Sequence, residues 1–493
     1  MSLSIPRGSL SQPILISVGF TLIFLALVAP GIYSVDGNAM LAVSESLVTH
    51  RGFTVPEGLG VPGVGGRIYS HWYPLLSVLA VPFAYLALLT SRVTHLPFHY
   101  LAAVFSLPMM GALTAATAGI VVLLARRIGA TEKGAWWAAV GFCIGTVALA
   151  YGRTFYAEPL LAFLTAAAVY FTFGKSLLNV VFGASLAALA MVAKPTGIIV
   201  GPILAAYLLV KGVPILRCAL PLLGTAIGFG FFAVFNVIRF GHPLDFGIHF
   251  PFQPSYFFSG AAGLLAGPGY GLLWYCPPVI LAVFGFYKAW KSYRFEALAI
   301  AAVFAGFLVL HSCLPYWFAA WSWGPRYLVP TLPVLCALSG LLEGGLRKTL
   351  VGLTVLGFAI NVPTTFSFYE RYYSELNEQG IPTEASLAWS FRYAPCLHGW
   401  PAAIRQVQDA EKSDVREIFA ERGAPSRTIS ESRALRVVAL WWWVLPIVHI
   451  PRIIGASVSL LTGLVGCWII YRARLEEDLR VSPRLADHLI PLP

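Results

Sequence analysis

The stretch ILISVGFTLIFLALVAPGIYSVD, residues 14–36, decides the class of fold. Its first part, Ile14 to Tyr33, is almost entirely apolar. A helix of about twenty apolar residues is long enough to cross the hydrocarbon core of a bilayer. The run then meets a carboxylate, Asp36, close to the predicted membrane boundary. A charged group at such a depth is costly and is a functional candidate by default.

The composition places much of the remaining chain in the membrane. Of the 493 residues, 58% are hydrophobic and 11% are charged, with a mean hydropathy of +0.75. Ordinary soluble domains carry about 25% charged residues, so we expect a polytopic membrane protein. The net charge of +11 comes mostly from Lys and Arg in short loops, a pattern typical of cytoplasmic loops rather than of a nucleic-acid surface. The seven cysteines form no CxxC or Cys/His cluster, and they indicate neither a disulfide framework nor a zinc site.

Basic residues indicate which apolar runs cross the membrane, because cytoplasmic loops are enriched in Lys and Arg. With the N-terminus in the cytoplasm, thirteen spans would place Arg126 and Arg127 outside. If residues 73–90 lie at the outer face instead, all the basic loops fall inside. We therefore predict an all-α bundle of about twelve spans with both termini cytoplasmic. The runs on either side of Lys194-Pro195 could also form one kinked region. The thirteen runs are 12–32, 73–90, 98–125, 135–151, 157–174, 177–193, 196–210, 218–235, 270–287, 296–313, 328–345, 349–366 and 452–471.

This topology divides the chain into three parts. Residues 1–366 are expected to form the transmembrane module, with a first outer loop at 33–97. Residues 367–451 contain the only sizeable polar stretch, and we expect them to cap the outer face and to include an interfacial helix. Residues 452–493 are expected to hold the last transmembrane helix and a cytoplasmic tail.

Asp36 has a structural explanation as well as a functional one. The apolar spacing in Asn38–His50 is that of an amphipathic helix lying on the membrane surface. Asp36 would then be the N-cap of this helix. Capping and chemistry are compatible, because the same side chain could begin the helix and face a substrate.

Five further motifs fall on the predicted outer side. They are YSHWYP (69–74), RTFYAE (153–158), AKPTG (193–197), NVIRFGHPLDFG (236–247) and WFAAWSWGPRY (317–327). Each has an ordinary explanation: an interfacial aromatic belt, a plain ion pair, or a lysine that reaches the headgroups. Together they put one acid, several cations and many aromatic rings on one face. That set suits a phosphate at membrane depth with a polar group outside it.

The order of these motifs resembles the GT-C glycosyltransferases, in the branch that contains protein O-mannosyltransferases and lipid A aminoarabinose transferases. The resemblance rests on the acid after the first span, the interfacial loop and four motifs: Tyr-Ser-His-Trp-Tyr-Pro, Arg-Thr-x-x-x-Glu, Ala-Lys-Pro-x-Gly and Trp-Gly-Pro-Arg-Tyr. It covers roughly residues 10–330. It implies a GT-C-like helix bundle and an enzyme that moves a sugar from a polyprenyl phosphate to an acceptor hydroxyl outside the cytoplasm, usually with inversion.

The resemblance also implies roles for individual residues. Asp36 matches the general base that deprotonates the acceptor. The donor phosphate is expected to contact Lys194, His71, Arg153 and Arg326. Further contacts to substrate are expected from Tyr69, Glu158, Asn236, His242, Asp245 and Trp323.

This chain departs from the family pattern in one respect. Relatives often carry two acids after the first span, whereas Gly37 follows Asp36 here. Only isolated acids occur in the motifs, so we expect no obligatory cofactor and predict no divalent metal. A single base suits an inverting displacement, although Glu158 leaves a retaining route formally open.

The expected partners are the lipid-linked sugar donor, membrane lipids, and a lipid, glycan or protein acceptor, without nucleic acid. The expected location is a bacterial inner membrane, with the site on its outer face. Three rival functions fit the same face: a transporter or flippase of lipid-linked sugars, a glycan polymerase or ligase, and a non-catalytic assembly subunit. Asp36→Asn separates the first from a transferase, because transport needs no base.

Overall fold

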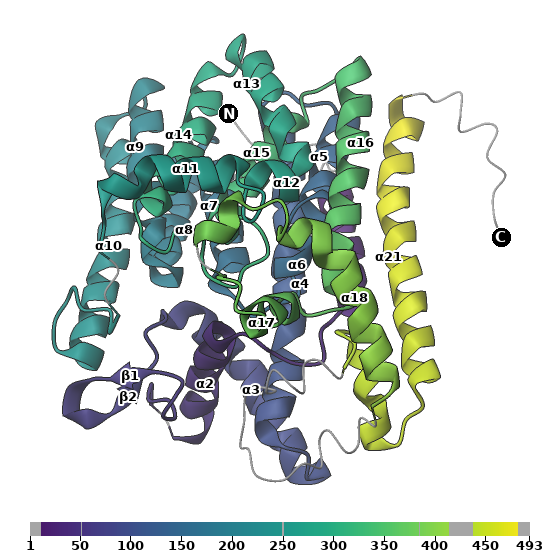
Figure 1. Cartoon of the computed structure of the whole chain (residues 1–493). Coiled ribbons are helices and arrows are strands. Elements are labelled where there is room, and N and C mark those ends of the chain that lie inside the picture. The colour runs from purple at the N-terminus through teal and green to yellow at the C-terminus, as the bar shows by residue number, and fades with distance from the viewer. Residues whose placement is uncertain (1–10, 51, 249–250, 384, 414–436, 482–493) are drawn as a thin grey trace.

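The computed structural model describes residues 11–50, 52–248, 251–383, 385–413 and 437–481 (Figure 1). In this part of the chain, helices are joined by loops and 3-10 turns, and one two-stranded antiparallel sheet pairs β1 (Val61–Pro62) with β2 (Ile68–Tyr69). The helices of the N-terminal half are α1 (Ser11–Ala26), α2 (Val35–Thr49), α3 (Pro74–Thr94), α4 (Phe98–Arg127), α5 (Glu132–Gly145), α6 (Ala148–Tyr151), α7 (Ala157–Thr172), α8 (Leu177–Ala193), α9 (Val200–Val210) and α10 (Ile215–Phe240). Those of the C-terminal half are α11 (Phe257–Ala266), α12 (Leu272–Tyr275), α13 (Ala282–Trp290), α14 (Arg294–Ser312), α15 (Leu332–Ser339), α16 (Gly344–Asn361), α17 (Glu370–Glu378), α18 (Pro395–Glu411) and α21 (Arg452–Val481).

The prediction of a helical polytopic membrane protein is confirmed. Six helical segments in the described part are long and apolar enough to cross a membrane: α3, α4, α10, α14, Gly344–Thr365 and Arg452–Leu475. Five shorter apolar segments accompany them: Ser11–Ala26, Ala157–Thr172, Leu177–Ala193, Pro195–Val210 and Arg326–Ser339. Large apolar side chains face outward, such as Ile227 (61% exposed) and Leu460 (64% exposed). Lipid contact explains their exposure. The number of twelve spans stays a prediction.

Small residues bring the two ends of the chain together. A Cβ on Gly19 of α1 would lie 2.8 Å from the carbonyl oxygen of Gly466 in α21. A Cβ on Gly466 would lie 2.6 Å from the carbonyl oxygen of Gly19. Backbones this close require residues without side chains, as in other tightly packed membrane helix pairs. The yellow helix α21 in Figure 1 is therefore attached to the bundle through α1.

The chain is interrupted at Lys194-Pro195, so the runs 177–193 and 196–210 form two helices. Helix α8 ends at Ala193, and Lys194 takes an extended conformation with φ −160° and ψ 136°. Pro195 then starts a 3-10 turn that leads into α9. Since proline disfavours a helical conformation in the residue before it, the break is encoded locally. It leaves Lys194 at a helix end.

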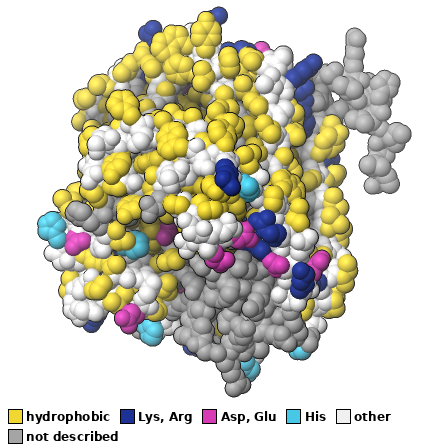
Figure 2. Space-filling view, in the orientation of Figure 1, with side chains coloured by type: hydrophobic (Ala, Val, Ile, Leu, Met, Phe, Trp, Pro, Cys, Tyr) yellow, Lys and Arg dark blue, Asp and Glu magenta, His cyan; other side chains and the backbone are white. Residues whose placement is uncertain are grey.

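One end of the bundle carries the polar elements. Figure 1 shows α2, the β1–β2 hairpin and α3 at the lower end, with α17 just above them. Figure 2 shows apolar side chains over the upper part, basic residues along the top edge and also around and below the middle, and most acids below the middle. The basic top edge follows the pattern expected of a cytoplasmic face. Helix α3 covers the run 73–90 and is long enough to span, so its predicted outer-face position stays a prediction.

Candidate active site

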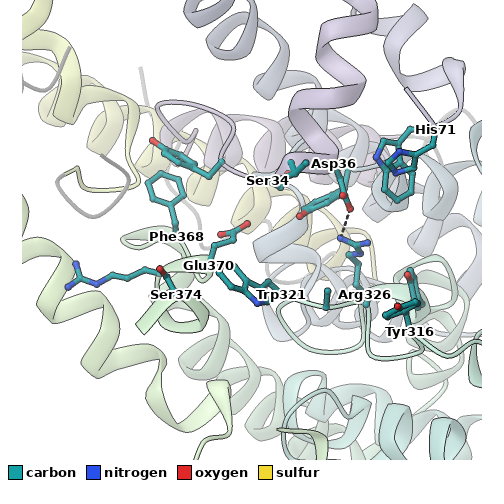
Figure 3. A pocket seen from close by; sticks show the side chains of 17 residues that line it. Ser34, Asp36, His71, Tyr316, Trp321, Arg326, Phe368, Glu370 and Ser374 are labelled. Atoms are coloured by element: carbon teal, nitrogen blue, oxygen red, sulfur yellow. Dashed lines mark hydrogen bonds and ion pairs between the residues drawn. The ribbon is translucent and has the colours of Figure 1, made fainter. Parts of the chain in front are cut away.

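A cavity of about 520 Å³ opens at the polar end of the bundle. Its walls come from five places: the start of α2, the loop before α3, the residue before α7, the loop after α14, and the start of α17. Figure 3 shows their side chains gathered around it. The main lining residues are Tyr33, Ser34, Asp36, His71, Trp72, Tyr156, Tyr316, Trp321, Arg326, Tyr327, Phe368, Glu370, Arg371 and Ser374.

The predicted N-cap role of Asp36 is wrong, and the reason is a better cap nearby. Helix α2 begins at Val35, and the Ser34 hydroxyl accepts a hydrogen bond from the Gly37 amide at 3.1 Å. Serine is among the preferred capping residues. Asp36 therefore lies in the first turn, where the helix dipole stabilises a carboxylate. Its side chain is 26% exposed and lines the cavity.

Gly37 occupies a position where a second acid does not fit. A Cβ at this position would lie 2.7 Å from the Ser34 hydroxyl oxygen, 2.8 Å from an Ile32 methyl group and 2.8 Å from the Phe155 carbonyl oxygen. Separations under 3.0 Å force the neighbours to move, and one of these neighbours is backbone. A side chain at position 37 is therefore disfavoured in this fold.

Asp36 is paired with Arg326 across the cavity. Arg326 Nη1 lies 3.1 Å from Asp36 Oδ2, as the dashed line in Figure 3 marks. The Arg326 side chain is only 7% exposed. Its guanidinium also lies 4.7 Å from the centre of the Tyr156 ring. The pair is held on one side by packing and is open to the cavity at Asp36.

Two more charges continue this pair into the protein. Arg326 Nε lies 3.4 Å from Glu158 Oε1, and Lys194 Nζ lies 2.7 Å from the same oxygen. Glu158 is 3% exposed and Lys194 is 11% exposed. Lys194 Nζ also lies 4.7 Å from the centre of the Tyr327 ring. The order Asp36, Arg326, Glu158, Lys194 alternates in sign, so each buried charge has an opposite neighbour.

His71 lines the cavity but is not a cation at neutral pH. Burial, with a further contribution from the charge of Arg239, lowers the pKa of its imidazole to about 4, although Asp36 acts in the opposite direction. The ring packs against Trp72 with their centroids 4.5 Å apart. Its buried Nδ1 has no hydrogen-bond partner among the described residues. His71 therefore lines the cavity as a neutral ring rather than as a cation.

Glu370 is a second carboxylate in the cavity, and the sequence motifs did not single it out. It begins α17 and is half-buried. Burial raises the pKa of its carboxyl to about 7, with a smaller contribution from the negative charge of Asp36. Figure 3 shows its side chain in the same cavity as Asp36 and Arg326. In the sequence it was one of many charges in a mixed polar stretch, and no motif marked it.

Arg153 lies behind the cavity and acts as a structural clamp. Its Nε donates to the Leu27 carbonyl oxygen, and its two terminal nitrogens donate to the carbonyl oxygens of Thr364, Thr365 and Ala439. It is 5% exposed and is not among the residues that line the large cavity. Arg153 therefore joins the end of α1 to the segments around residues 364–365 and 439. We leave it out of the proposed donor site.

The motif at 236–247 supports the loop that carries His71. Buried Arg239 donates to the carbonyl oxygens of Ser70 and Trp72 and to Asn236 Oδ1. The exposed His242 and Asp245 accept hydrogen bonds from backbone amides within their own turn. None of Asn236, His242 and Asp245 lines the cavity.

Tyr69 and Trp323 are also buried away from the cavity. Tyr69 lies in β2 and packs edge-on against Phe240, with ring centroids 6.2 Å apart. Trp323 is 2% exposed and donates from its indole nitrogen to Asn361 Oδ1 at 2.8 Å. The aromatic side chains from the same motif that line the cavity are Trp321 and Tyr327. Within the described residues, no group of three or more His, Cys, Asp or Glu side chains is arranged to hold a metal ion.

Comparisons with known proteins found similarity only among solved structures. No family model matches the chain, and no curated protein matches it in sequence. Solved structures do match. ArnT from Cupriavidus metallidurans bound to undecaprenyl phosphate aligns over 97% of this chain and 80% of its own, at 16% identity and a TM-score of 0.48. The oligosaccharyltransferase AglB from Archaeoglobus fulgidus, in complex with an inhibitory peptide and a dolichol-phosphate, aligns over 88% of this chain and 60% of its own, at 12% identity and a TM-score of 0.45.

Proposed function

We propose that this protein is a membrane glycosyltransferase that moves a sugar from a polyprenyl-phosphate donor to an acceptor hydroxyl on the outer face of a bacterial inner membrane. The observation that carries the proposal is the pairing of Asp36 with Arg326 in a 520 Å³ cavity at the polar end of an apolar helix bundle. A base and a phosphate-binding cation within one cavity are the two groups that this reaction requires.

Asp36 acts as the general base. One of its carboxylate oxygens is held by Arg326, and the partly exposed side chain offers the other to a ligand. The acceptor hydroxyl gives its proton to this carboxylate while its oxygen attacks the anomeric carbon. The bond from that carbon to the phosphate oxygen breaks, and polyprenyl phosphate leaves with the electron pair. A single displacement of this kind inverts the anomeric configuration.

Arg326 couples the two halves of the reaction electrostatically. Before transfer, the charges of Asp36 and Glu158 balance those of Arg326 and Lys194. Protonation of Asp36 removes one negative charge, and Arg326 then has an unbalanced positive charge. At the same moment the phosphate of the donor gains its second negative charge. A cation already in place for the developing charge lowers the barrier without reorganisation of solvent.

Lys194 supports the phosphate site from behind Arg326. It does not line the cavity, and its ammonium lies against Glu158 and the Tyr327 ring. It keeps Glu158 from neutralising Arg326 alone, so that part of the arginine's charge remains available to the donor. His71 adds a neutral hydrogen-bonding group, and Trp321 and Tyr316 add aromatic faces that suit a sugar ring.

A donor panel tests this proposal directly. The purified full-length protein is placed in lipid with radiolabelled polyprenyl-phosphate sugars and crude membrane acceptors. We expect one donor to lose its sugar to an acceptor with release of polyprenyl phosphate. Tight donor binding without release of polyprenyl phosphate would favour the transporter or the assembly subunit. Extension of the product by further transfers would favour the glycan polymerase or ligase.

A further inference from the structure

A second hollow lies between α9 and α14, away from the cavity that holds Asp36. It has a volume of about 400 Å³. Figure 1 shows both helices in the upper part of the molecule, above α2 and α17. Helix α9 contributes Ile203, Ala206 and Val210, and α14 contributes Leu298. Val210 is 57% exposed and Leu298 is 44% exposed, so the hollow opens to the surroundings of the bundle.

Apart from the hydroxyl of Tyr207, the side chains that line this hollow carry no polar atom. That hydroxyl donates to Glu296 Oε1 at 2.9 Å, and Lys211 Nζ lies 2.9 Å from the same oxygen. The polar group of the tyrosine is therefore satisfied inside the protein. What remains open is a long apolar surface with an ionic cluster at one end.

Cations exceed acids in this cluster. Lys211 Nζ lies 5.4 Å from the centre of the Phe295 ring, and the Arg294 guanidinium lies 4.5 Å from the same centre. Phe295 itself lines the hollow. Lys175 lies in the turn between α7 and α8, beside Lys211. Partial burial lowers the pKa of Lys175, and the positive charge of Lys211 lowers it further. This end of the hollow thus holds three cations, Lys175, Lys211 and Arg294, and one carboxylate, Glu296.

We propose that this hollow binds an anionic phospholipid of the cytoplasmic leaflet, with an acyl chain against α9 and α14 and the headgroup phosphate on Lys175, Lys211 and Arg294. The excess positive charge supplies the complementarity to the phosphate. The predicted topology places residues 175, 211 and 294 in cytoplasmic loops, where anionic lipids meet the protein. Basic pockets between transmembrane helices on this side are suited to such headgroups. The site is separate from the proposed active site and does not depend on its chemistry.

Lipid binding to the purified full-length protein tests the proposal. Native mass spectrometry in detergent would compare phosphatidylglycerol with phosphatidylcholine, which carries no net charge. We expect wild type to retain phosphatidylglycerol selectively. The combined change Lys175→Gln and Arg294→Gln leaves the Lys211–Glu296 pair intact. We expect it to lower the affinity for phosphatidylglycerol roughly fivefold for each cation removed. Ala206→Trp fills the hollow without changing charge, and we expect it to weaken binding as well.

Lys348→Gln is the matched control, because it removes an exposed basic residue on α16 and should bind phosphatidylglycerol as wild type does. Soluble glycerol phosphate tests whether the site recognises the headgroup alone or the whole lipid. We expect it to compete only weakly with phosphatidylglycerol. Equal retention of the two lipids by wild type would overturn the proposal. So would unchanged phosphatidylglycerol binding in either variant, or glycerol phosphate binding as tightly as the lipid.

Discussion

Arg326 and Asp36 stand 290 positions apart in the sequence, and the fold brings their side chains within 3.1 Å of one another. Arg326 also lies 3.4 Å from Glu158, so a single guanidinium contacts two carboxylates. One of these carboxylates is buried and the other faces a cavity. The protonation state of Asp36 therefore decides how far the positive charge of Arg326 is balanced. The mechanism proposed above depends on this change of balance.

The buried pair of Glu158 and Lys194 gives the first prediction. Removing either partner leaves one unbalanced charge among Asp36, Arg326, Glu158 and Lys194. We expect Glu158→Gln and Lys194→Met each to lower the free energy of unfolding by about 3–5 kcal/mol. The double variant should lose much less than the sum, because neither charge is then left alone. Unfolding in detergent, followed for all four proteins, measures the coupling, and additive losses would contradict the pairing.

Arg153 gives a prediction about stability rather than activity. Arg153→Lys keeps the charge but cannot reach four carbonyl oxygens at once. Each buried carbonyl left without a donor costs about 1–3 kcal/mol. We expect a lower unfolding temperature, with the KM for the donor unchanged in the folded fraction. Arg67→Lys in the exposed first outer loop is the matched control. A raised KM with normal stability would instead return Arg153 to the donor site.

His71 predicts how stability depends on pH. Because its pKa is about 4 in the folded protein and about 6.5 when unfolded, the unfolded chain binds more protons between these values. Wild type therefore loses stability as the pH falls from 6.5 towards 4, by at most about 3 kcal/mol from this group. We expect His71→Gln to lose less over the same range in thermal unfolding. His50→Gln, which changes an exposed histidine, should follow wild type. Parallel curves for all three proteins would show that His71 is not buried as described.

Glu370 predicts how activity depends on pH. Its carboxyl has a pKa of about 7, so it becomes charged as the pH rises through neutrality. A charged Glu370 would compete with Asp36 for Arg326 and repel the donor phosphate. We expect wild-type transfer to fall as the pH rises through 7, and Glu370→Gln to remove this step while keeping activity. Measured pH profiles of kcat/KM decide the matter. A profile of Glu370→Gln that still falls near 7 would assign the step to another group.

Much of the fold follows from local sequence properties. Long apolar runs predict the helices, and Lys194-Pro195 predicts the break between α8 and α9 that the structure contains. The motifs at Asp36, His71 and Arg326 predict residues that the structure gathers in one cavity. An ionisable group at a membrane boundary is rare and so is informative about location, while the roles of these residues stay predictions.

The remainder depends on tertiary contacts that no local pattern reveals. The roles expected for Arg153, Trp323 and Asn236 do not match their positions, because distant backbone and side-chain partners occupy their polar groups. Glu370 was not predicted from the sequence, because nothing in its own stretch sets it apart. Its stretch is polar throughout, and only the packing of α17 against the cavity distinguishes it from the charges beside it.

The exchange of Asp36 for Asn tests the central claim most directly. Sugar transfer in a single turnover would be measured for wild type, Asp36→Asn and Asp245→Asn, with donor binding measured in parallel. Asp245 is an exposed aspartate outside the cavity, so its variant controls for the loss of a charge. We predict that Asp36→Asn binds donor but transfers the sugar about 10²–10⁴-fold more slowly, and that Asp245→Asn matches wild type. Equal transfer rates for Asp36→Asn and wild type would contradict the assignment of Asp36 as the base.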